Sequence, residues 1–260
     1  MLIQIVFLGE ASEMTVEHLN IQSIPAITWG ETSPKAYLYL HGQGGNKEEA
    51  AAFASIANHY GWQVLSIDLP EHGERKNEQD LFNPWTIVPE LLTVMQYAKN
   101  RWGKIALFAN SIGAWFSMLS FGNEKLEKGL FVSPVLDMEM LIQKMMSWAN
   151  VSQERLKHEQ TIPTTFGQTL SWKYWEYATK NKITQWQVPT KILYAGKDHL
   201  TDRDTVEAFT KTYNCELTIW ETGEHWFHTQ PQLDFLYSWM DNNIRPSNVK
   251  TKFKEIKMER

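Results

Sequence analysis

The chain has 260 residues, of which 43% are hydrophobic and 21% are charged. This composition is ordinary for a globular protein and supplies a core large enough to fold without disulfides or metal ions. The formal net charge of −5 excludes a generally basic surface for nucleic acid, and the single Cys215 excludes an internal disulfide.

The terminal segments indicate no membrane anchor. Residues 1–8 are apolar, but they lack a cationic flank and a small-residue cleavage site and are too short to cross a bilayer. We interpret them as a first strand and predict a cytoplasmic protein with neither a membrane nor a nucleic-acid partner. Residues 250–260 concentrate Lys and Arg but also carry Glu255 and Glu259, which is typical of a solvated terminus.

Short β-rich runs alternate with longer helical patterns from Lys35 onward. This alternation is typical of βαβ units in a parallel sheet with helices on both faces. The predicted parallel strands are residues 35–40, 63–67, 104–108, 129–132, 191–194 and 217–220, and an antiparallel edge is predicted at residues 1–8 and 21–28. The predicted helices are residues 47–59, 84–100, 112–121, 204–212 and 233–243. The expected fold class is therefore α/β, with a mostly parallel, doubly wound sheet of about eight strands.

Residues 136–187 interrupt this alternation. They carry helical periodicity twice, with no convincing strand between. The first pattern has an apolar stripe, and aromatic residues crowd the second, as the sequence shows at Met138, Leu141, Ile142, Met145, Trp172, Tyr174, Trp175 and Tyr177. Such stripes usually pack in a core, but an inserted aromatic pair of helices also suits a cap over a pocket. We expect residues 1–135 and 188–243 to form the core, residues 136–187 a helical cap, and residues 244–260 a charged tail.

The strongest chemical signal is the run Ala109-Asn110-Ser111-Ile112-Gly113, which follows a predicted buried strand and begins a predicted helix. In a nucleophile elbow, a Ser occupies a strained turn from strand to helix, and the residues two before and two after it must be small so that the backbones can pass closely. Ala109 and Gly113 meet this requirement. The alternative is a Ser that caps an ordinary helix, since a five-residue match also arises by chance.

The elbow resembles that of the α/β-hydrolase superfamily, whose usual form is G-x-S-x-G, with Ala109 here in place of the first Gly. The resemblance extends from Lys35 to about Asn243, because further motifs occur in the family's chain order. It implies that Ser111 is a nucleophile. It also implies the α/β-hydrolase fold.

A Gly-rich loop at residues 41–45 (His-Gly-Gln-Gly-Gly) directly follows a predicted strand, as the family's oxyanion loop does. The resemblance implies that the backbone N–H groups of Gln43 and Ile112 face the developing oxyanion, and Ile112 also lies at a helix N-terminus. A phosphate-binding loop is the alternative, but no Lys-Ser or Lys-Thr follows the glycines. His41 is expected to be structural, with hydrogen bonds inside its loop.

The family's chain order of Ser, acid and His places the acid downstream of Ser111. Residues 68–73 (Asp-Leu-Pro-Glu-His-Gly) resemble the family's D-x-P-G-H-G turn, with Glu71 in place of a Gly, and support only the fold. Residues 196–199 (Gly-Lys-Asp-His) match the family's acid position, which implies that Asp198 is the triad acid. Asp202 and Asp204 are expected to cap the next helix instead.

The catalytic histidine implied by the resemblance is His225. It follows Gly223 and the last predicted strand and precedes the terminal helix, and this position favours it over His228. In such a triad Asp198 orients the imidazole, which removes the proton from Ser111. The histidines show neither H-E-x-x-H nor paired-Cys spacing, so we expect no metal and no cofactor.

The leading hypothesis is a carboxylesterase-like serine hydrolase that cleaves small or medium carboxylic esters, as small-molecule substrates, through an acyl-enzyme. The residues expected to contact substrate from the cap are Met145, Met146, Trp148, Trp172 and Trp175. Two alternatives remain open. The N-S-x-G run at Asn110 also resembles hydrolases that cleave carbon–carbon bonds in dienoic ketoacids, and a non-catalytic binding protein could keep the fold. The sequence does not indicate an oligomeric state.

Overall fold

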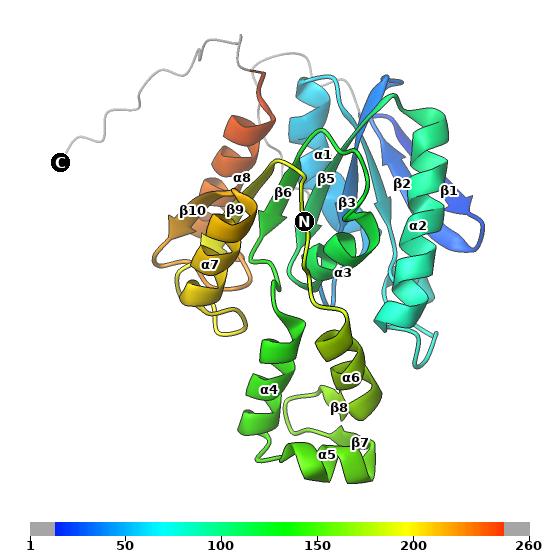
Figure 1. Cartoon of the computed structure of the whole chain (residues 1–260). Coiled ribbons are helices and arrows are strands. Elements are labelled where there is room, and N and C mark those ends of the chain that lie inside the picture. Colours follow the sequence, from blue (N-terminus) through cyan, green and yellow to red (C-terminus); the bar gives the residue numbers. More distant parts are fainter. Residues whose placement is uncertain (1–13, 247–260) are drawn as a thin grey trace, which may run out of the picture.

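The computed structural model describes residues 14–246, which fold around one eight-stranded sheet (Figure 1). In spatial order the strands are β1 Val16–Ile21, β2 Ile24–Trp29, β4 Gln63–Ile67, β3 Lys35–Leu40, β5 Lys104–Asn110, β6 Gly129–Val132, β9 Thr190–Ala195 and β10 Glu216–Trp220. Neighbouring strands from β4 to β10 are parallel, whereas β1 and β2 run antiparallel at one edge. The predicted mostly parallel α/β sheet of about eight strands is confirmed. The strand predicted at residues 1–8 and the segment 250–260 lie outside the described residues.

The strand order opens a crevice at the carboxyl ends of β3 and β5. From β3 the chain passes to β4 on one side and then crosses to β5 on the other side. Loops therefore leave these two strands in opposite directions, and open α/β sheets bind their ligands at such a switch point. The loop after Leu40 and the turn after Asn110 both begin here.

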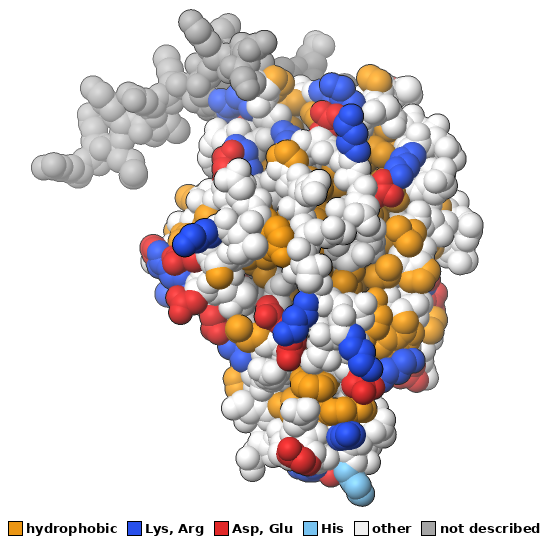
Figure 2. Space-filling view, in the orientation of Figure 1, with side chains coloured by type: hydrophobic (Ala, Val, Ile, Leu, Met, Phe, Trp, Pro, Cys, Tyr) orange, Lys and Arg blue, Asp and Glu red, His pale blue; other side chains and the backbone are white. Residues whose placement is uncertain are grey.

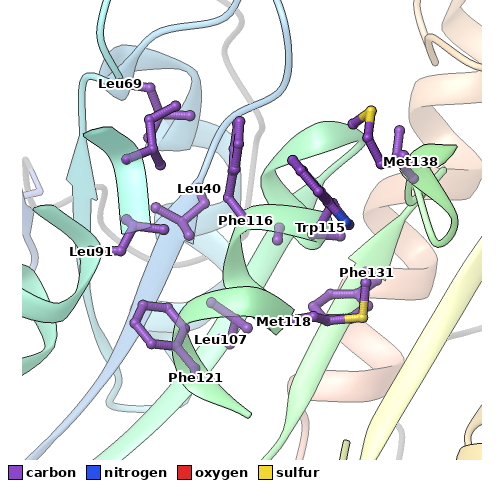
Figure 3. Packing of buried hydrophobic residues seen from close by; sticks show 14 of the residues in the cluster. Leu40, Leu69, Leu91, Leu107, Trp115, Phe116, Met118, Phe121, Phe131 and Met138 are labelled. Carbon is purple, nitrogen blue, oxygen red and sulfur yellow. The ribbon is translucent and has the colours of Figure 1, made fainter. Parts of the chain in front are cut away.

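Helices cover both faces of the sheet (Figure 1). On one face lie α1 Ala50–His59, preceded by the 3₁₀ turn η1 Lys47–Glu49, and α8 Gln230–Ile244; on the other lie α2 Pro84–Arg101, α3 Ile112–Phe121 and α7 Arg203–Tyr213. Buried side chains form one cluster on each face. Figure 3 shows part of the larger cluster, to which Trp115 and Phe116 of α3 and Leu40 and Leu107 of the sheet belong.

Local sequence explains where α2 begins. The side chain of Asn83 accepts a hydrogen bond from the N–H of Thr86 at 2.9 Å, and Pro84 occupies the first turn, where its missing N–H is not needed. The helix buries Leu91 and Met95, four residues apart on one face. A short 3₁₀ turn, η2 Gly73–Arg75, precedes this helix.

The antiparallel edge differs from the prediction. The sequence predicts one strand over residues 21–28, whereas the structure forms a hairpin of β1 and β2 with Ile21 opposite Ile24. The turn places Gln22 at φ 55°, without the Gly or Asn that usually marks such a hairpin. β1 is mostly exposed, so it lacks the apolar alternation by which a strand is found in a sequence.

The segment 136–187, called the insertion from here on, follows β6 and lies beyond the carboxyl ends of the strands (Figure 1). It contains α4 Met138–Trp148, α5 Gln153–Glu159, the hairpin of β7 Thr161–Pro163 and β8 Thr169–Ser171, and α6 Trp172–Lys180. The two predicted helices are present, but the expectation of no strand between them was wrong. Strands of three residues are too short to give a periodic signal.

The surface seen in Figure 2 intersperses basic and acidic side chains, and hydrophobic atoms gather where the lower end of α2 approaches α6. Within residues 14–246, no helix has both the length and the apolar character needed to span a membrane.

Candidate active site

The turn from β5 to α3 holds Ser111 in a strained conformation. Its φ of 49° and ψ of −121° are rare for a residue with a side chain. The neighbours allow this turn because Gly113 passes very close to β3. A Cβ on Gly113 would lie 2.6 Å from the carbonyl oxygen of His41 and 2.9 Å from that of Leu40. The strand runs to Asn110, two residues further than predicted, so the serine directly follows the sheet edge.

Ser111, His225 and Asp198 form a continuous hydrogen-bonded series. Ser111 Oγ lies 2.9 Å from His225 Nε2, and His225 Nδ1 lies 2.7 Å from Asp198 Oδ2. The carboxylate of Asp198 accepts a hydrogen bond from Nδ1–H of His225, so the proton of the neutral ring stays on Nδ1 and Nε2 is free to accept the hydroxyl proton of Ser111. The structure therefore brings the three predicted triad residues together. His228 instead has its Nδ1 2.7 Å from the carbonyl oxygen of Trp226.

The loop at residues 198–202, called the acid loop from here on, fixes the orientation of Asp198. The carboxylate of Asp198 is fully buried, and its second oxygen accepts the N–H of Leu200 at 2.8 Å and that of Thr201 at 3.3 Å. One oxygen is thus committed to the loop and the other to His225.

Asp202 does not cap α7 as predicted. It occupies the N-cap position but makes no side-chain hydrogen bond to the helix. Its Oδ1 lies 2.7 Å from Nζ of Lys144, so the carboxylate forms an ion pair with Lys144 instead of accepting a hydrogen bond from the first turn of α7. Asp204 lies in the first turn of α7, where a carboxylate complements the helix dipole.

The loop at residues 41–45 lies against the elbow. A Cβ on Gly42 would lie 3.2 Å from Cβ of Ser111. Gln43 and Ile112, the two predicted oxyanion-hole residues, line the same cavity as Ser111. Among the turns and loops of residues 14–246, neither the N–H of Gln43 nor that of Ile112 donates a hydrogen bond to a backbone carbonyl. Ile112 is the first residue of α3, so its N–H has no partner inside the helix.

Two histidines hold this loop in place. His41 donates from Nδ1 to the carbonyl of Gly42 at 2.8 Å and accepts the N–H of Leu69 at Nε2 at 3.0 Å. His72 donates from Nδ1 to the carbonyl of Pro70 and accepts the N–H of Gly44 at 2.9 Å. Burial lowers the pKa of His41 to about 4, so its imidazole is neutral at pH 7.

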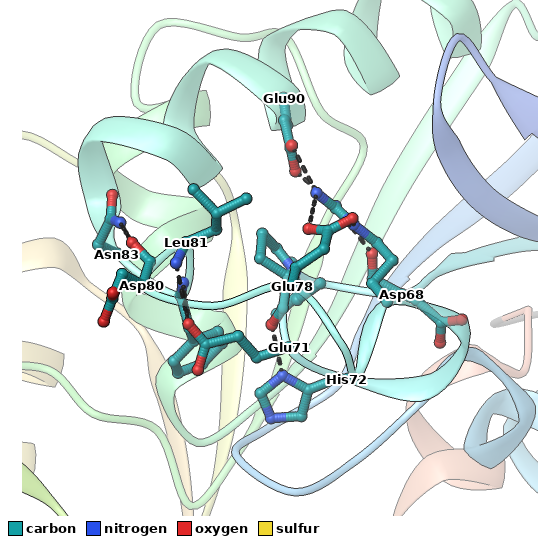
Figure 4. A network of polar contacts seen from close by, with 12 residues as sticks. Asp68, Glu71, His72, Glu78, Asp80, Leu81, Asn83 and Glu90 are labelled. Carbon is teal, nitrogen blue, oxygen red and sulfur yellow. Dashed lines mark hydrogen bonds and ion pairs between the residues drawn. The ribbon is translucent and has the colours of Figure 1, made fainter.

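The segment 68–83 adds a polar network (Figure 4). Asp68 is buried and accepts hydrogen bonds from Nζ of Lys47 and from the N–H of Glu74, so its role is structural. Glu71 adopts φ 65°, a left-handed conformation that Gly adopts most readily. Its carboxylate accepts the N–H groups of Leu81 and Phe82 at 2.9 and 3.0 Å, so the side chain orders the following loop.

A cavity of about 1000 Å³ contains Ser111 in its wall. This volume lies at the upper end of the range typical of small-molecule sites, about 300–1,000 Å³. The helix α4 contributes an apolar side, formed by Met138, Leu141, Ile142 and Met145. Glu71 and Asp80 are the acidic residues of the lining, and no Lys or Arg of the described chain belongs to it.

The predicted substrate contacts divide into two groups. Met145 and Trp148 line the cavity, whereas Met146, Trp172 and Trp175 are not part of its lining. Met146 is buried in the core cluster, and Trp172 stacks on Trp175 with ring centroids 5.0 Å apart. Helical spacing explains the difference between the two methionines, because adjacent residues on a helix point to different faces.

Several lining residues were missed by the sequence analysis. They come from the segment that follows β4, from the first turn of α2, from the β7–β8 hairpin and from α6, and include Phe82, Trp85, Phe166 and Tyr174. His199 and Leu200 of the acid loop also contribute. Of these missed residues, only His199 could have been found from the sequence, because it directly follows the predicted triad acid Asp198.

Metal ligands do not gather in this site. Among residues 14–246, no group of three or more His, Cys, Asp or Glu side chains is arranged to hold a metal ion.

Solved structures of hydrolases share this fold. Est1E from Butyrivibrio proteoclasticus with bound ferulic acid aligns with a TM-score of 0.68 and 17% identity, over 88% of this chain and 97% of that one. Mouse alpha/beta hydrolase domain-containing protein 10 gives 0.70 and 12% identity, over 88% and 98%. A thioesterase domain from the curacin biosynthetic pathway gives 0.56 and 16% identity, over 88% and 99%. No protein-family model and no curated protein sequence matches the chain.

Proposed function

We propose that this chain, which has the α/β-hydrolase fold, is a serine hydrolase that cleaves small or medium carboxylic esters through an acyl-enzyme. One observation carries the proposal: the hydrogen-bonded series from Ser111 through His225 to Asp198 begins at a strained strand-to-helix turn in the wall of a large cavity. Structures named as a Pyrococcus furiosus esterase and a thioesterase domain share the fold and support ester cleavage as the reaction type.

In the proposed reaction, Ser111 Oγ attacks the ester carbonyl while its proton passes to Nε2 of His225. The carbonyl oxygen becomes an oxyanion that the N–H groups of Gln43 and Ile112 receive. The tetrahedral intermediate collapses, and His225 returns the proton to the departing alcohol. Water then attacks the acyl-enzyme by the same route in reverse, and the carboxylic acid is released. Asp198 keeps the imidazole in one tautomer and stabilises its cationic form throughout.

Cleavage of carbon–carbon bonds has less support. That alternative depends on Asn110 beside the nucleophile, but Asn110 Nδ2 donates to the hydroxyl of Tyr39 at 3.1 Å and does not line the cavity. The residue therefore has a structural partner behind the elbow.

A fluorophosphonate probe tests the proposal directly. The wild-type protein should be labelled at Ser111, as identified by mass spectrometry of its peptides, and Ser111→Ala should remove both the label and ester turnover. The turnover number should fall by several orders of magnitude, about 10³-fold or more, with the fold preserved. An unlabelled wild type would identify a non-catalytic binding protein, and a variant that keeps a tenth of the rate would exclude Ser111 as the nucleophile.

A substrate panel then separates the reaction types. Chromogenic esters, a thioester and a dienoic ketoacid are compared by kcat/KM. Methyl ferulate is included because Est1E has been solved with ferulic acid. A higher kcat/KM for the dienoic ketoacid than for every ester would replace the proposed reaction by carbon–carbon cleavage.

A further inference from the structure

Lys144 joins the insertion to the acid loop. It lies on α4, and its Nζ is 2.7 Å from Oδ1 of Asp202, 3.3 Å from the carbonyl oxygen of His199 and 3.4 Å from that of Leu200. An ammonium group has three N–H donors and no acceptor. All three acceptors belong to the same loop of five residues, which also carries Asp198.

The core holds the other side of the acid loop. Thr201 Oγ1 donates to the carbonyl of Pro134 at 2.9 Å, and the hydroxyl of Tyr194 donates to the carbonyl of Thr201 at 3.0 Å. These bonds fix the end of the loop but not the two residues between Asp198 and Thr201. Among the residues that the structure describes, Lys144 is the insertion's one side chain that hydrogen-bonds this loop.

The same helix also forms the apolar side of the cavity. Met145, next to Lys144 in the chain, lines the cavity, and so do His199 and Leu200, whose carbonyls Lys144 binds. A substrate under α4 therefore contacts the insertion and the acid loop together. The Lys144 side chain is 23% exposed and that of Asp202 is 52% exposed, so their ion pair is partly screened by solvent, and the two carbonyl contacts add to it.

We propose that Lys144 is a positioning residue, which acts by holding the acid loop so that Asp198 orients His225. The inference rests on the proposed function of the triad. A small displacement of a catalytic group can cost about 10²-fold in rate. Loss of this contact should therefore lower the rate of the chemical step, although Lys144 touches neither the nucleophile nor the base.

The test compares Lys144→Met with a matched control, Lys182→Met. Lys182 Nζ lies 2.6 Å from Oε2 of Glu139, so this control also removes an ion pair to α4 but does not reach the acid loop. With p-nitrophenyl butyrate, we expect kcat of K144M to fall about tenfold with KM within about twofold, and both constants of K182M to stay within about twofold. K144R should recover kcat to within about threefold of the wild type, because it keeps the charge and donors.

A double-mutant cycle with Asp198→Asn shows whether Lys144 acts through the acid. If it does, adding K144M to D198N should lower kcat by no more than about twofold, because the orientation it supports is already lost. A full tenfold loss in the D198N background would overturn the inference. It would also be overturned by an equal loss in K182M, by unchanged kcat in K144M, or by a rise in KM alone.

Two further measurements keep the outcome decisive. If K144M does not fold, as judged by its thermal unfolding midpoint, Asp202→Asn removes the same ion pair from the loop side, and kcat should fall about threefold because the two carbonyl contacts remain. A D202N variant with unchanged kcat then overturns the inference. If the wild type neither hydrolyses the ester nor reacts with a fluorophosphonate, the proposed function itself is overturned. If the wild type reacts, but K144M lowers kcat equally with and without D198N, only the role of Lys144 is overturned.

Discussion

The imidazole of His225 donates from Nδ1 to the buried carboxylate of Asp198 across 2.7 Å. The bond selects the tautomer in which Nε2 can accept the proton of the Ser111 hydroxyl, 2.9 Å away. In the proposed mechanism, Asp198 therefore contributes by fixing which nitrogen of His225 carries the proton.

Replacing that acid by its amide should therefore remove most of the activity. Asp198→Asn is expected to lower kcat by about 10³- to 10⁴-fold, because an amide N–H facing Nδ1 favours the opposite tautomer. Asp204→Asn should change kcat by less than about twofold, since an exposed first-turn carboxylate contributes only about 0.3–1 kcal/mol to its helix. Steady-state kinetics with one chromogenic ester compare them. Equal losses in the two variants would remove Asp198 from the triad.

The parallel strands and the triad were predictable from the sequence, for different reasons. β4 and β6 are buried along their whole length, and β6 is a continuous apolar run, whereas β4 includes the buried polar residues Gln63 and Ser66; the predicted bounds of both strands agree with the structure. The position of Ser111 follows from the small residues Ala109 and Gly113 around it, whereas the positions of Asp198 and His225 were implied by the resemblance to the α/β-hydrolase superfamily and its chain order. That the three triad residues lie close together depends on the strand order, which places the carboxyl ends of β5, β9 and β10 at the same edge of the sheet.

The lining of the cavity was less predictable, because it depends on which way each helix faces. On α6, Tyr174 lines the cavity, whereas Trp172 and Trp175 stack on one another away from it. All three are aromatic, so the hydrophobic pattern does not separate them. The partner of Asp202 was also hidden, since Lys144 lies 58 residues away in the chain.

A methyl group at Gly113 should destabilise the protein. In Gly113→Ala the added Cβ would lie 2.6 Å from a backbone carbonyl oxygen at the end of β3, which cannot move without disturbing the sheet. We expect the free energy of unfolding to fall by about 3 kcal/mol, at the upper end of typical overpacking costs. Urea unfolding at pH 7 measures it.

Gly103→Ala is the matched control for that variant. Its added Cβ would lie 3.7 Å from the carbonyl oxygen of Pro34, an ordinary contact. The free energy of unfolding should change by less than about 1 kcal/mol. Similar stabilities for the two variants would contradict the close approach of α3 to β3.

Stability should also depend on the protonation of His41. Burial lowers the pKa of His41 to about 4, against about 6.5 in the unfolded chain. Between pH 4 and pH 6.5, the unfolded state binds a proton at His41 that the folded state does not bind. The contribution of the neutral His41 to the free energy of unfolding is therefore complete above pH 6.5 and is lost as the pH falls toward 4. The contribution is at most about 3 kcal/mol.

His41→Asn removes this titration and should flatten the pH dependence. The variant should be less stable than the wild type at pH 7, because it loses hydrogen bonds to Gly42 and Leu69. Its further loss between pH 7 and pH 4.5 should be smaller by about 2 kcal/mol, measured by urea unfolding. His18→Asn, at an exposed position on β1, should keep the wild-type dependence. Identical pH slopes for all three proteins would show that His41 does not resist protonation.

The apolar side of the cavity should set the preference for the acyl group. Esters of p-nitrophenol with acetyl, butyryl, hexanoyl and succinyl groups share one leaving group. We expect kcat/KM to rise from acetyl to butyryl, since each buried methylene contributes about 0.8 kcal/mol. For succinyl it should collapse, because no Lys or Arg of residues 14–246 lines the cavity while Glu71 and Asp80 do.

Adjacent methionines on α4 provide the matched test of this preference. Met145 lines the cavity and Met146 is buried in the core beside it, so Met145→Ala and Met146→Ala remove the same atoms from different surroundings. Met145→Ala should reduce the gain in kcat/KM from acetyl to butyryl by about threefold or more. Met146→Ala should keep that gain and instead lower the thermal unfolding midpoint, because a core Met→Ala change costs about 2–5 kcal/mol. A flat wild-type series, a preference for succinyl, or equal losses of chain-length preference in both variants would exclude α4 from substrate selection.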